Sequence, residues 1–197
     1  VQARWQELPL TASARLDGVA PFALTARLDA PIAARISPEL SWPALELTAS
    51  ATGTLQALTL QLRGQPAAAH ARDTFTLQGE ARLAPFAAQP LQAITLTAHR
   101  LAPQMFHPSA PQALLTARID AQPDAAGALA GTLQLDNARP AALDRQGLPL
   151  ERLHTRLRLL WQERARQLQL NDLQIQAGKG QLRGQVDLHW PVTGDGK

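Results

Sequence analysis

The chain has 197 residues, of which 45% are hydrophobic and 4% aromatic, so it can bury one core or a run of repeats built mainly from Leu and Ala. It contains no Cys, which excludes disulfides and Cys-based metal sites, and its Arg residues are spread along the chain, which argues against a dedicated phosphate-binding face. No apolar run approaches the roughly 20 residues of a transmembrane helix. Because the chain starts at Val1 without an initiating Met, we expect an internal segment of a longer protein.

Apolar and polar residues alternate along most of the chain. A period of two predicts strands with one buried and one wet face, even where Ala and Leu lower the strand propensity. Pro and Gly separate the runs, and Gly53 is expected to be a turn. About a dozen strands are expected, and the clearest alternation covers 10–18, 22–30, 45–52, 58–62, 75–83, 94–98, 115–119, 129–135 and 182–188.

Three places break this alternation. Residues 101–108, with two prolines, predict a loop or a single helical turn, and 136–150 predicts a long connector whose Leu148 and Leu150 fold back on the sheet. The apolar phase slips at Asn171-Asp172, which predicts a β-bulge or a turn. Residues 177–180 then form a tight-turn sequence.

Residues 151–166 fit two structures. In a strand, Leu153, Leu157 and Leu159 face inward and arginines face outward. In a helix, Leu153, Leu157 and Trp161 line one side. The surrounding β pattern favours the strand.

A short motif, Leu-x-Gly-x-apolar-x-Leu, occurs three times, starting at Leu77, Leu129 and Leu182. The spacings are 129 − 77 = 52 and 182 − 129 = 53 residues. A near-constant period of this size predicts repeated units. We expect residues 1–197 to form one segment of a repeating β-groove, with units at roughly 30–84, 85–137 and 138–190.

No catalytic motif is present, and no catalytic residue, metal site or cofactor is predicted. The five histidines are far apart and are interpreted as solvated surface residues, and the carboxylates stand singly. Arginines 152, 156, 158, 164 and 166 form the densest positive group. Without aromatic platforms it indicates a solvated sheet face, and no nucleic-acid partner is expected, although contact with anionic headgroups stays open.

The predicted fold class is all-β, an elongated, curled antiparallel sheet that leaves an open hydrophobic groove. A filled β-sandwich core is the alternative. Repeats that extend the sheet, inward Gly79, Gly131 and Gly184 at its bends, and few bulky aromatics favour the groove, which at about 4.8 Å per strand would run roughly 55 Å. Aliphatic and aromatic residues at inward positions are the predicted groove lining: Leu45, Leu47, Leu60, Leu62, Phe75, Leu77, Ile94, Leu96, Leu115, Ile119, Leu129, Leu133, Leu135, Leu157, Leu168, Leu170, Ile175, Leu182, Val186 and Leu188.

Several short stretches resemble the TamB family of bacterial translocation and assembly proteins, and AsmA-like proteins share this kind of sequence patterning. They are 51–55, 101–106, 111–114, 133–137, 145–150, 168–170 and 178–184, so the resemblance covers most of the chain from about 45 to 190. It rests on patterning and short signatures. The segments that would hold the family's N-terminal anchor and its partner-docking end are not among them.

The resemblance implies a periplasm-spanning protein anchored in the inner membrane, with a β-taco body. It also implies phospholipid transport toward the outer membrane and an outer-membrane barrel partner of the TamA type, contacted through regions outside this segment. We expect acyl chains to lie on the inward residues and a charge at Leu96, Leu133 or Leu182 to obstruct transport. The alternatives are a scaffold that holds unfolded β-barrel clients by β-augmentation, and an adhesin-like stalk with a filled core.

Overall fold

Twelve strands form the fold in the computed structural model, which describes residues 2–5, 8–34, 43–67, 75–87, 89–161 and 165–191. Two single 3-10 turns, η2 (Pro103–Met105) and η3 (Leu143–Arg145), interrupt them. The strands are β1 (Gln2–Trp5), β2 (Leu8–Leu16), β3 (Ala23–Ile32), β4 (Leu45–Thr54), β5 (Ala57–Pro66), β6 (Thr76–Leu83), β7 (Leu91–Leu101), β8 (Leu115–Pro123), β9 (Leu129–Asn137), β10 (Arg152–Trp161), β11 (Ala165–Ala177) and β12 (Gly180–Pro191).

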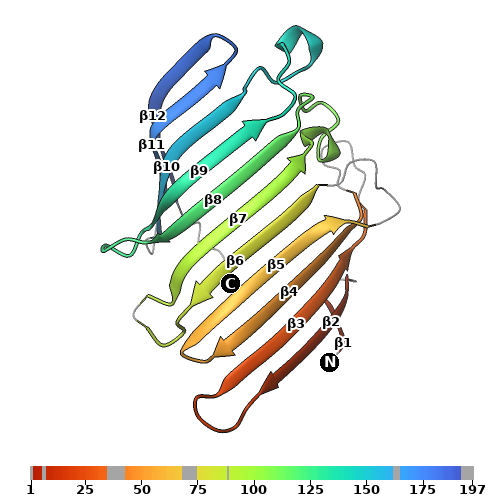
Figure 1. The fold of residues 1–197 in the computed structure, drawn as a ribbon, viewed down its shortest axis with the longest axis vertical. Coiled ribbons are helices and arrows are strands. Elements are labelled where there is room, and N and C mark those ends of the chain that lie inside the picture. The colour runs from red at the N-terminus through yellow and green to blue at the C-terminus, as the bar shows by residue number, and fades with distance from the viewer. Residues whose placement is uncertain are drawn as a thin grey trace.

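Each strand pairs antiparallel with the next one along the chain, so the sheet order is simply β1 to β12 (Figure 1). The two end strands do not pair with each other, and the sheet therefore stays open. This confirms the predicted all-β class and the open antiparallel sheet. An unbroken meander of this kind is the simplest topology, because every connection joins neighbouring strands.

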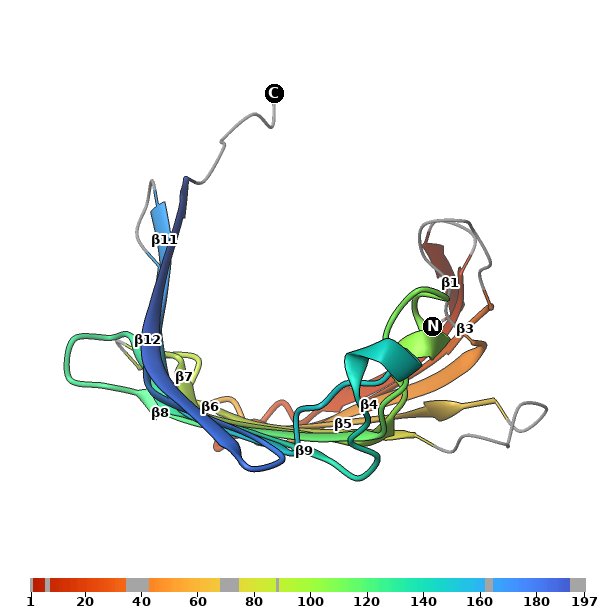
Figure 2. The ribbon, with the colours of Figure 1, turned by 90° about the horizontal axis from the view of Figure 1, so that it is seen from above.

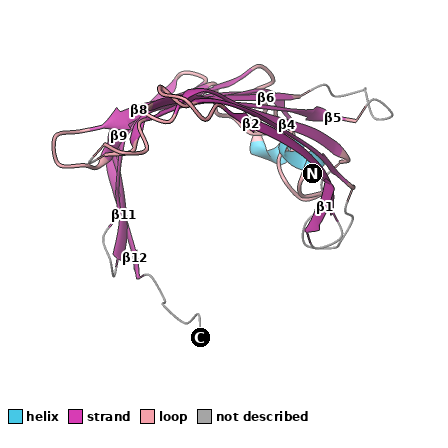
Figure 3. Ribbon diagram, turned by 90° about the horizontal axis from the view of Figure 1, so that it is seen from below, coloured by secondary structure: helices cyan, strands magenta, loops and turns pink. Residues whose placement is uncertain are grey.

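The sheet is a single curved layer. Figures 2 and 3 show it end-on as a trough, with β11 and β12 rising on one side and β1 to β3 on the other. Its accessible surface is 13735 Å² for 21.2 kDa. A compact protein of that mass exposes roughly 9,000 Å². The additional exposed surface follows from the missing second layer. A surface this large excludes a filled sandwich for the described sheet.

Both 3-10 turns lie on the inner side of the curve, at the same ends of the strands (Figures 1 and 2). Their connectors are joined by a short bridge between Gln112 and Gly147. The Leu148 N–H also donates to the Gln112 carbonyl at 3.3 Å, as expected for a connector that folds back. The loop or helical turn predicted at 101–108 is confirmed by η2.

Asn137, at the end of β9, ties these connectors to the sheet. Its side-chain oxygen accepts the Leu114 and Arg139 N–H groups at 3.1 and 3.0 Å. Its amide donates to the carbonyls of Leu148 and Leu150 at 3.1 and 2.9 Å. Every hydrogen-bonding position of the buried amide is therefore used.

The described residues of 151–166 form strand and not helix: β10 covers 152–161 and β11 begins at Ala165. The predicted bulge is confirmed, because the β11–β12 register shifts between Leu170 and Leu173, with Asp172 at φ 52°. The tight turn predicted before β12 is the two-residue turn at 178–179.

Local predictions failed at the strand ends. Gly53 is not a turn but the penultimate residue of β4, paired with Leu24 and Leu58, and the chain turns two residues later. Phe22 was assigned to a strand, yet it lies outside β3 with φ 55°. β1 has four residues and too little alternation to be recognised.

Candidate functional site

The strand register aligns the inward residues into rows that cross the sheet. Residues directly opposite each other on neighbouring strands point to the same face, so each row is continuous. The central row is Ala12, Leu28, Ala49, Leu62, Gly79, Leu96, Ile119, Leu133 and Thr155.

Two further rows flank it. One is Ala14, Ala26, Ala51, Leu60, Ala81, Ile94, Ala121, Gly131, Leu157, Leu170 and Val186. The other is Ala30, Leu47, Gly64, Leu77, Ala98, Ala117, Leu135, Leu153, Ile175 and Leu182. Apart from Thr155, the side chains of these rows are aliphatic or absent.

An open groove of about 580 Å³ lies over β2 to β7. Its surface is almost wholly apolar, and the inward residues that line it come from two of the rows: Ala12, Ala14, Ala26, Leu28, Ala49, Ala51, Leu60, Leu62, Gly79, Ala81, Ile94 and Leu96. The inward lining residues on β2, β4 and β6 are alanine and glycine. The larger Leu and Ile side chains come from β5, β7 and, through Leu28, from β3.

Polar residues of the same strands face the other way and are held there. Arg27 donates from Nε to Asp29 at 2.9 Å, and Asp29 also accepts the Thr48 hydroxyl at 3.0 Å. The same arrangement recurs on β8, where Arg118 and the hydroxyl of Thr95 both donate to Asp120. The Arg partner lowers the pKa of both carboxyls and so stabilises their ionised form on the outer face.

The predicted lining residues share this inward face. Most are half-buried, as residues on an open sheet are, while Phe75 and Leu115 are buried under the connectors. Leu182 and Leu188, on the last strand of the sheet, are exposed. Of the twenty, Leu60, Leu62, Ile94 and Leu96 line the groove over β2 to β7.

The aromatic contact between Phe75 and Phe106 explains why that end of the face is covered. Their rings meet edge-to-face at 6.2 Å, which holds the η2 connector against the start of β6. Ala113 and Leu114, next to Leu115, are buried in the same region. The groove is therefore open over β2 to β7 and covered at the connector ends of β6 to β10.

The inward face is not as free of polar residues as the sequence indicated. Thr155 is fully buried on the inward side of β10, and its hydroxyl donates to the Asn171 carbonyl at 2.9 Å. This hydrogen bond gives the Asn171 carbonyl a partner at the bulge that interrupts the β10–β11 register. A threonine within a run of leucines and arginines gave no signal of this role.

The three inward glycines of the repeated motif differ in their surroundings. A Cβ on Gly131 would lie 1.9 Å from the Asp120 carbonyl oxygen, whereas one on Gly184 would meet nothing within 4 Å. Gly79 is intermediate, with Leu96 at 3.3 Å. Close backbone approach therefore explains Gly131 alone. The motif copies fall on β6, β9 and β12, so neighbouring copies run in opposite directions.

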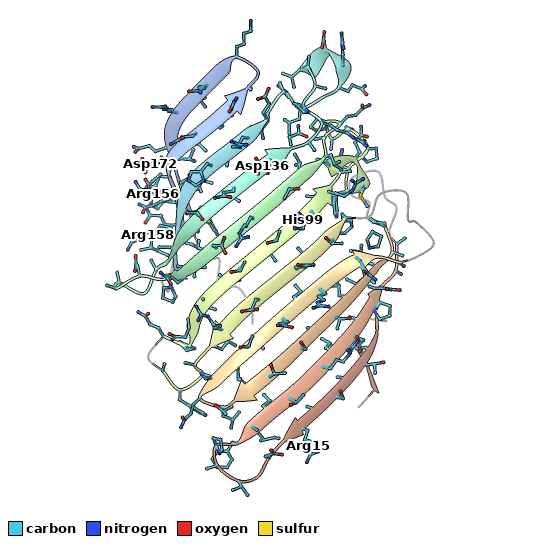
Figure 4. The ribbon with its side chains drawn as sticks, viewed as in Figure 1. Arg15, His99, Asp136, Arg156, Arg158 and Asp172 are labelled. Atoms are coloured by element: carbon cyan, nitrogen blue, oxygen red, sulfur yellow. The ribbon has the colours of Figure 1, made fainter. Side chains whose placement is uncertain are left out.

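The arginine group on β10 is neutralised by carboxylates. Arg152 pairs with Asp136 at 2.9 Å, Arg158 with Asp124 at 2.7 Å, and Arg156 with Asp172. Figure 4 shows Arg156, Arg158 and Asp172 together beside β10 and β11. Paired guanidinium groups offer little free charge to a phosphate. The side chains of Arg164 and Arg166 lie outside the described set.

Histidines in the described part of the chain stand apart, and no group of three or more metal-binding side chains occurs there. His99 and His189 are exposed, and His189 lies 3.4 Å from Asp187. His70 lies outside the described residues. Among the described residues, no helix has the length and apolar character needed to span a membrane.

Comparison with known proteins identifies no relative: no family model, no curated protein and no solved structure matches the chain.

Proposed function

We propose that this chain is part of a hydrophobic conduit that carries phospholipid with its acyl chains in the groove over β2 to β7. The observation that supports this is the groove itself: aliphatic rows run across many strands with one face uncovered. A sheet that leaves such a face open loses the hydrophobic stabilisation of a second layer. An apolar occupant restores it.

Acyl chains suit this surface better than polar ligands do. Burial of each methylene contributes about 0.8 kcal/mol, so partial shielding of two chains makes residence favourable. The groove lining holds no side-chain charge and no hydrogen-bonding anchor on its inward positions, so the occupant has no fixed register. Lipid tails slide along such rows while the headgroup stays in water at the open side.

We take the cellular setting of the proposed conduit from the sequence resemblance to TamB proteins alone. In that setting the chain belongs to a periplasmic protein anchored in the inner membrane. It moves phospholipid toward the outer membrane and works with a TamA-type barrel through regions outside this segment. No nucleic acid and no enzymatic activity enter this proposal.

A photo-crosslinking amino acid at two neighbouring positions tests the assignment of the groove. Leu62 points into the groove, and the exposed side chain of Gln61, the preceding residue, alternates to the outer face beside Thr48 and Arg63. On irradiation in cells, position 62 is expected to crosslink to phospholipid and position 61 is not. Equal crosslinking at both positions, or none at 62, contradicts the proposal.

A scaffold for β-barrel clients is the second candidate, and the length of β12 favours it. Among the described strands β12 has twelve residues and pairs with β11 alone, whereas β1 has four. A strand of this length can accept a client strand wherever its second side is unpaired. Client peptide that displaces bound lipid would favour a shared groove, while peptide that binds without displacing lipid would favour the edge.

A further inference from the structure

Two turns on the same rim of the sheet carry an identical tetrapeptide, Ala-Pro-Phe-Ala. The first copy is 20–23, between β2 and β3, and the second is 84–87, between β6 and β7. An even number of strands separates the two turns, so the meander brings both to the same long edge, where Figure 1 shows them.

In the first copy the aromatic ring is held at the turn by the backbone. The Phe22 N–H donates to the Val19 carbonyl at 2.9 Å. The Phe22 carbonyl accepts the N–H of Leu55, in the neighbouring β4–β5 turn, at 3.3 Å. Phe22 has φ 55°, a conformation that a bulky residue adopts only when its surroundings impose it. It stays 43% exposed, and Val19 beside it is 78% exposed.

In the second copy a β-turn presents the ring. The Ala87 N–H donates to the Ala84 carbonyl at 2.9 Å, which puts Pro85 and Phe86 at the two central positions of the turn. Phe86 is 77% exposed. Among the described residues the exposed aromatic side chains are Phe22, Phe86 and Trp190, so two of the three lie in turns of this rim.

Charged residues are absent from the two turns and lie at their borders. No Asp, Glu, Lys or Arg occurs in 18–26 or in 83–98. Charged residues border both stretches on the N-terminal side: exposed Arg15 and Asp17 precede the first, and exposed Glu80 and Arg82 precede the second. Asp17 lies 3.6 Å from Arg15 and offsets part of its charge.

An uncharged tip with exposed aromatic side chains, bordered by charged residues, matches a phospholipid surface. Aromatic and aliphatic side chains enter the headgroup and acyl boundary, while arginine stays at the phosphate level. The two tips are four strand spacings apart, roughly 19 Å at about 4.8 Å each, so both can touch one flat surface.

We propose that the rim formed by the β2–β3 and β6–β7 turns is a membrane-docking edge that inserts Val19, Phe22 and Phe86 into the interface of a phospholipid layer. This docking is separate from acyl-chain binding in the groove, and either can occur without the other. It brings the open side of the sheet to a lipid source.

The absence of Cys makes the test direct. Phe86→Cys carries an environment-sensitive fluorophore on the rim, and Leu143→Cys, which replaces a residue 72% exposed at the opposite strand ends, is the matched control. Each labelled protein is mixed with vesicles of phosphatidylcholine containing about a third phosphatidylglycerol. We expect a blue shift, and quenching by brominated acyl chains, at position 86 and neither at position 143.

Vesicle flotation of the unlabelled chain completes the test. Phe22→Ser with Phe86→Ser is expected to weaken binding by about tenfold or more, while Leu143→Ser leaves it unchanged. Because these residues lie in turns, circular dichroism checks that the sheet is retained. The docking edge is overturned if wild type does not float with the vesicles, or if the folded double variant floats as wild type does. Either result leaves acyl-chain binding in the groove untouched, because the crosslinking experiment tests that separately.

Discussion

Asn137 shows at the scale of one residue how the inner connectors are held. Its amide bonds to four backbone groups of the two connectors and is buried. Asn137→Ala leaves those groups without partners, so we expect the free energy of unfolding to fall by about 2–4 kcal/mol. Urea denaturation measures this. The exposed Asn171→Ala is the control, expected within about 0.5 kcal/mol of wild type.

The glycines of the repeated motif give a second test at this scale. Gly131→Ala forces a Cβ against the Asp120 carbonyl and Ala121, which is expected to cost about 1–3 kcal/mol or more. Gly184→Ala enters open space on a strand and is expected to stabilise by about 0.5–1 kcal/mol. Equal shifts in the urea midpoints of the two variants would contradict the close approach at Gly131.

At the scale of elements, Asp124 connects the β8–β9 turn to β10. It accepts the Arg158 guanidinium at 2.7 Å and the N–H groups of Ala126 and Ala128 at 2.8 and 3.0 Å. These donors, the arginine first, lower the pKa of the Asp124 carboxyl. The turn therefore depends on a carboxylate that stays ionised when an ordinary one has begun to protonate.

The sign of the pH effect follows from that lowered pKa. The contribution of Asp124 is complete above the ordinary carboxyl pKa of about 3.9 and is lost as the pH falls from there through the lowered value. Asp124→Asn keeps an oxygen for the turn but carries no charge. Wild type is expected to lose stability more steeply than this variant below about pH 4 in urea titrations; parallel profiles would show that the ion pair contributes nothing.

The strands could be predicted from the sequence because alternation is local and the burial of one face enforces it. Even the bulge at Asn171-Asp172 left a signal, since it shifts the phase of the apolar residues. Turn positions were harder. Glycine favours turns, but the pairing of β4 with β5 keeps Gly53 within β4. Phe22 fits the alternation of apolar and polar residues, yet its positive φ is not a strand conformation.

The sequence predicted which face of the sheet is apolar, but not which strands carry the open groove. The prediction emphasised large apolar residues, whereas the groove is also lined by alanines such as Ala26, Ala49 and Ala51, whose alternation was visible in the sequence. Which part of the face stays open depends on the connectors, and their attachment through Asn137 joins residues distant in sequence. No local pattern encodes that.

At the scale of the whole molecule, one layer of sheet carries an apolar face that no second layer covers. A charge placed in the groove is therefore expected to leave the fold intact more readily than it would in a closed core, because water reaches the site. Leu62→Arg at the groove and Gln61→Arg on the outer face of the same strand are a matched pair. Both are expected to retain the β circular dichroism spectrum, and unfolding of Leu62→Arg alone would indicate a closed interior.

Native mass spectrometry of the purified chain, with organic extraction and identification of any lipid, tests the central claim most directly. We expect phospholipid to accompany wild type and Gln61→Arg and to be lost from folded Leu62→Arg. Lipid-free wild type, or equal lipid in folded Leu62→Arg, would contradict the groove as the lipid site and favour the client scaffold along the β12 edge.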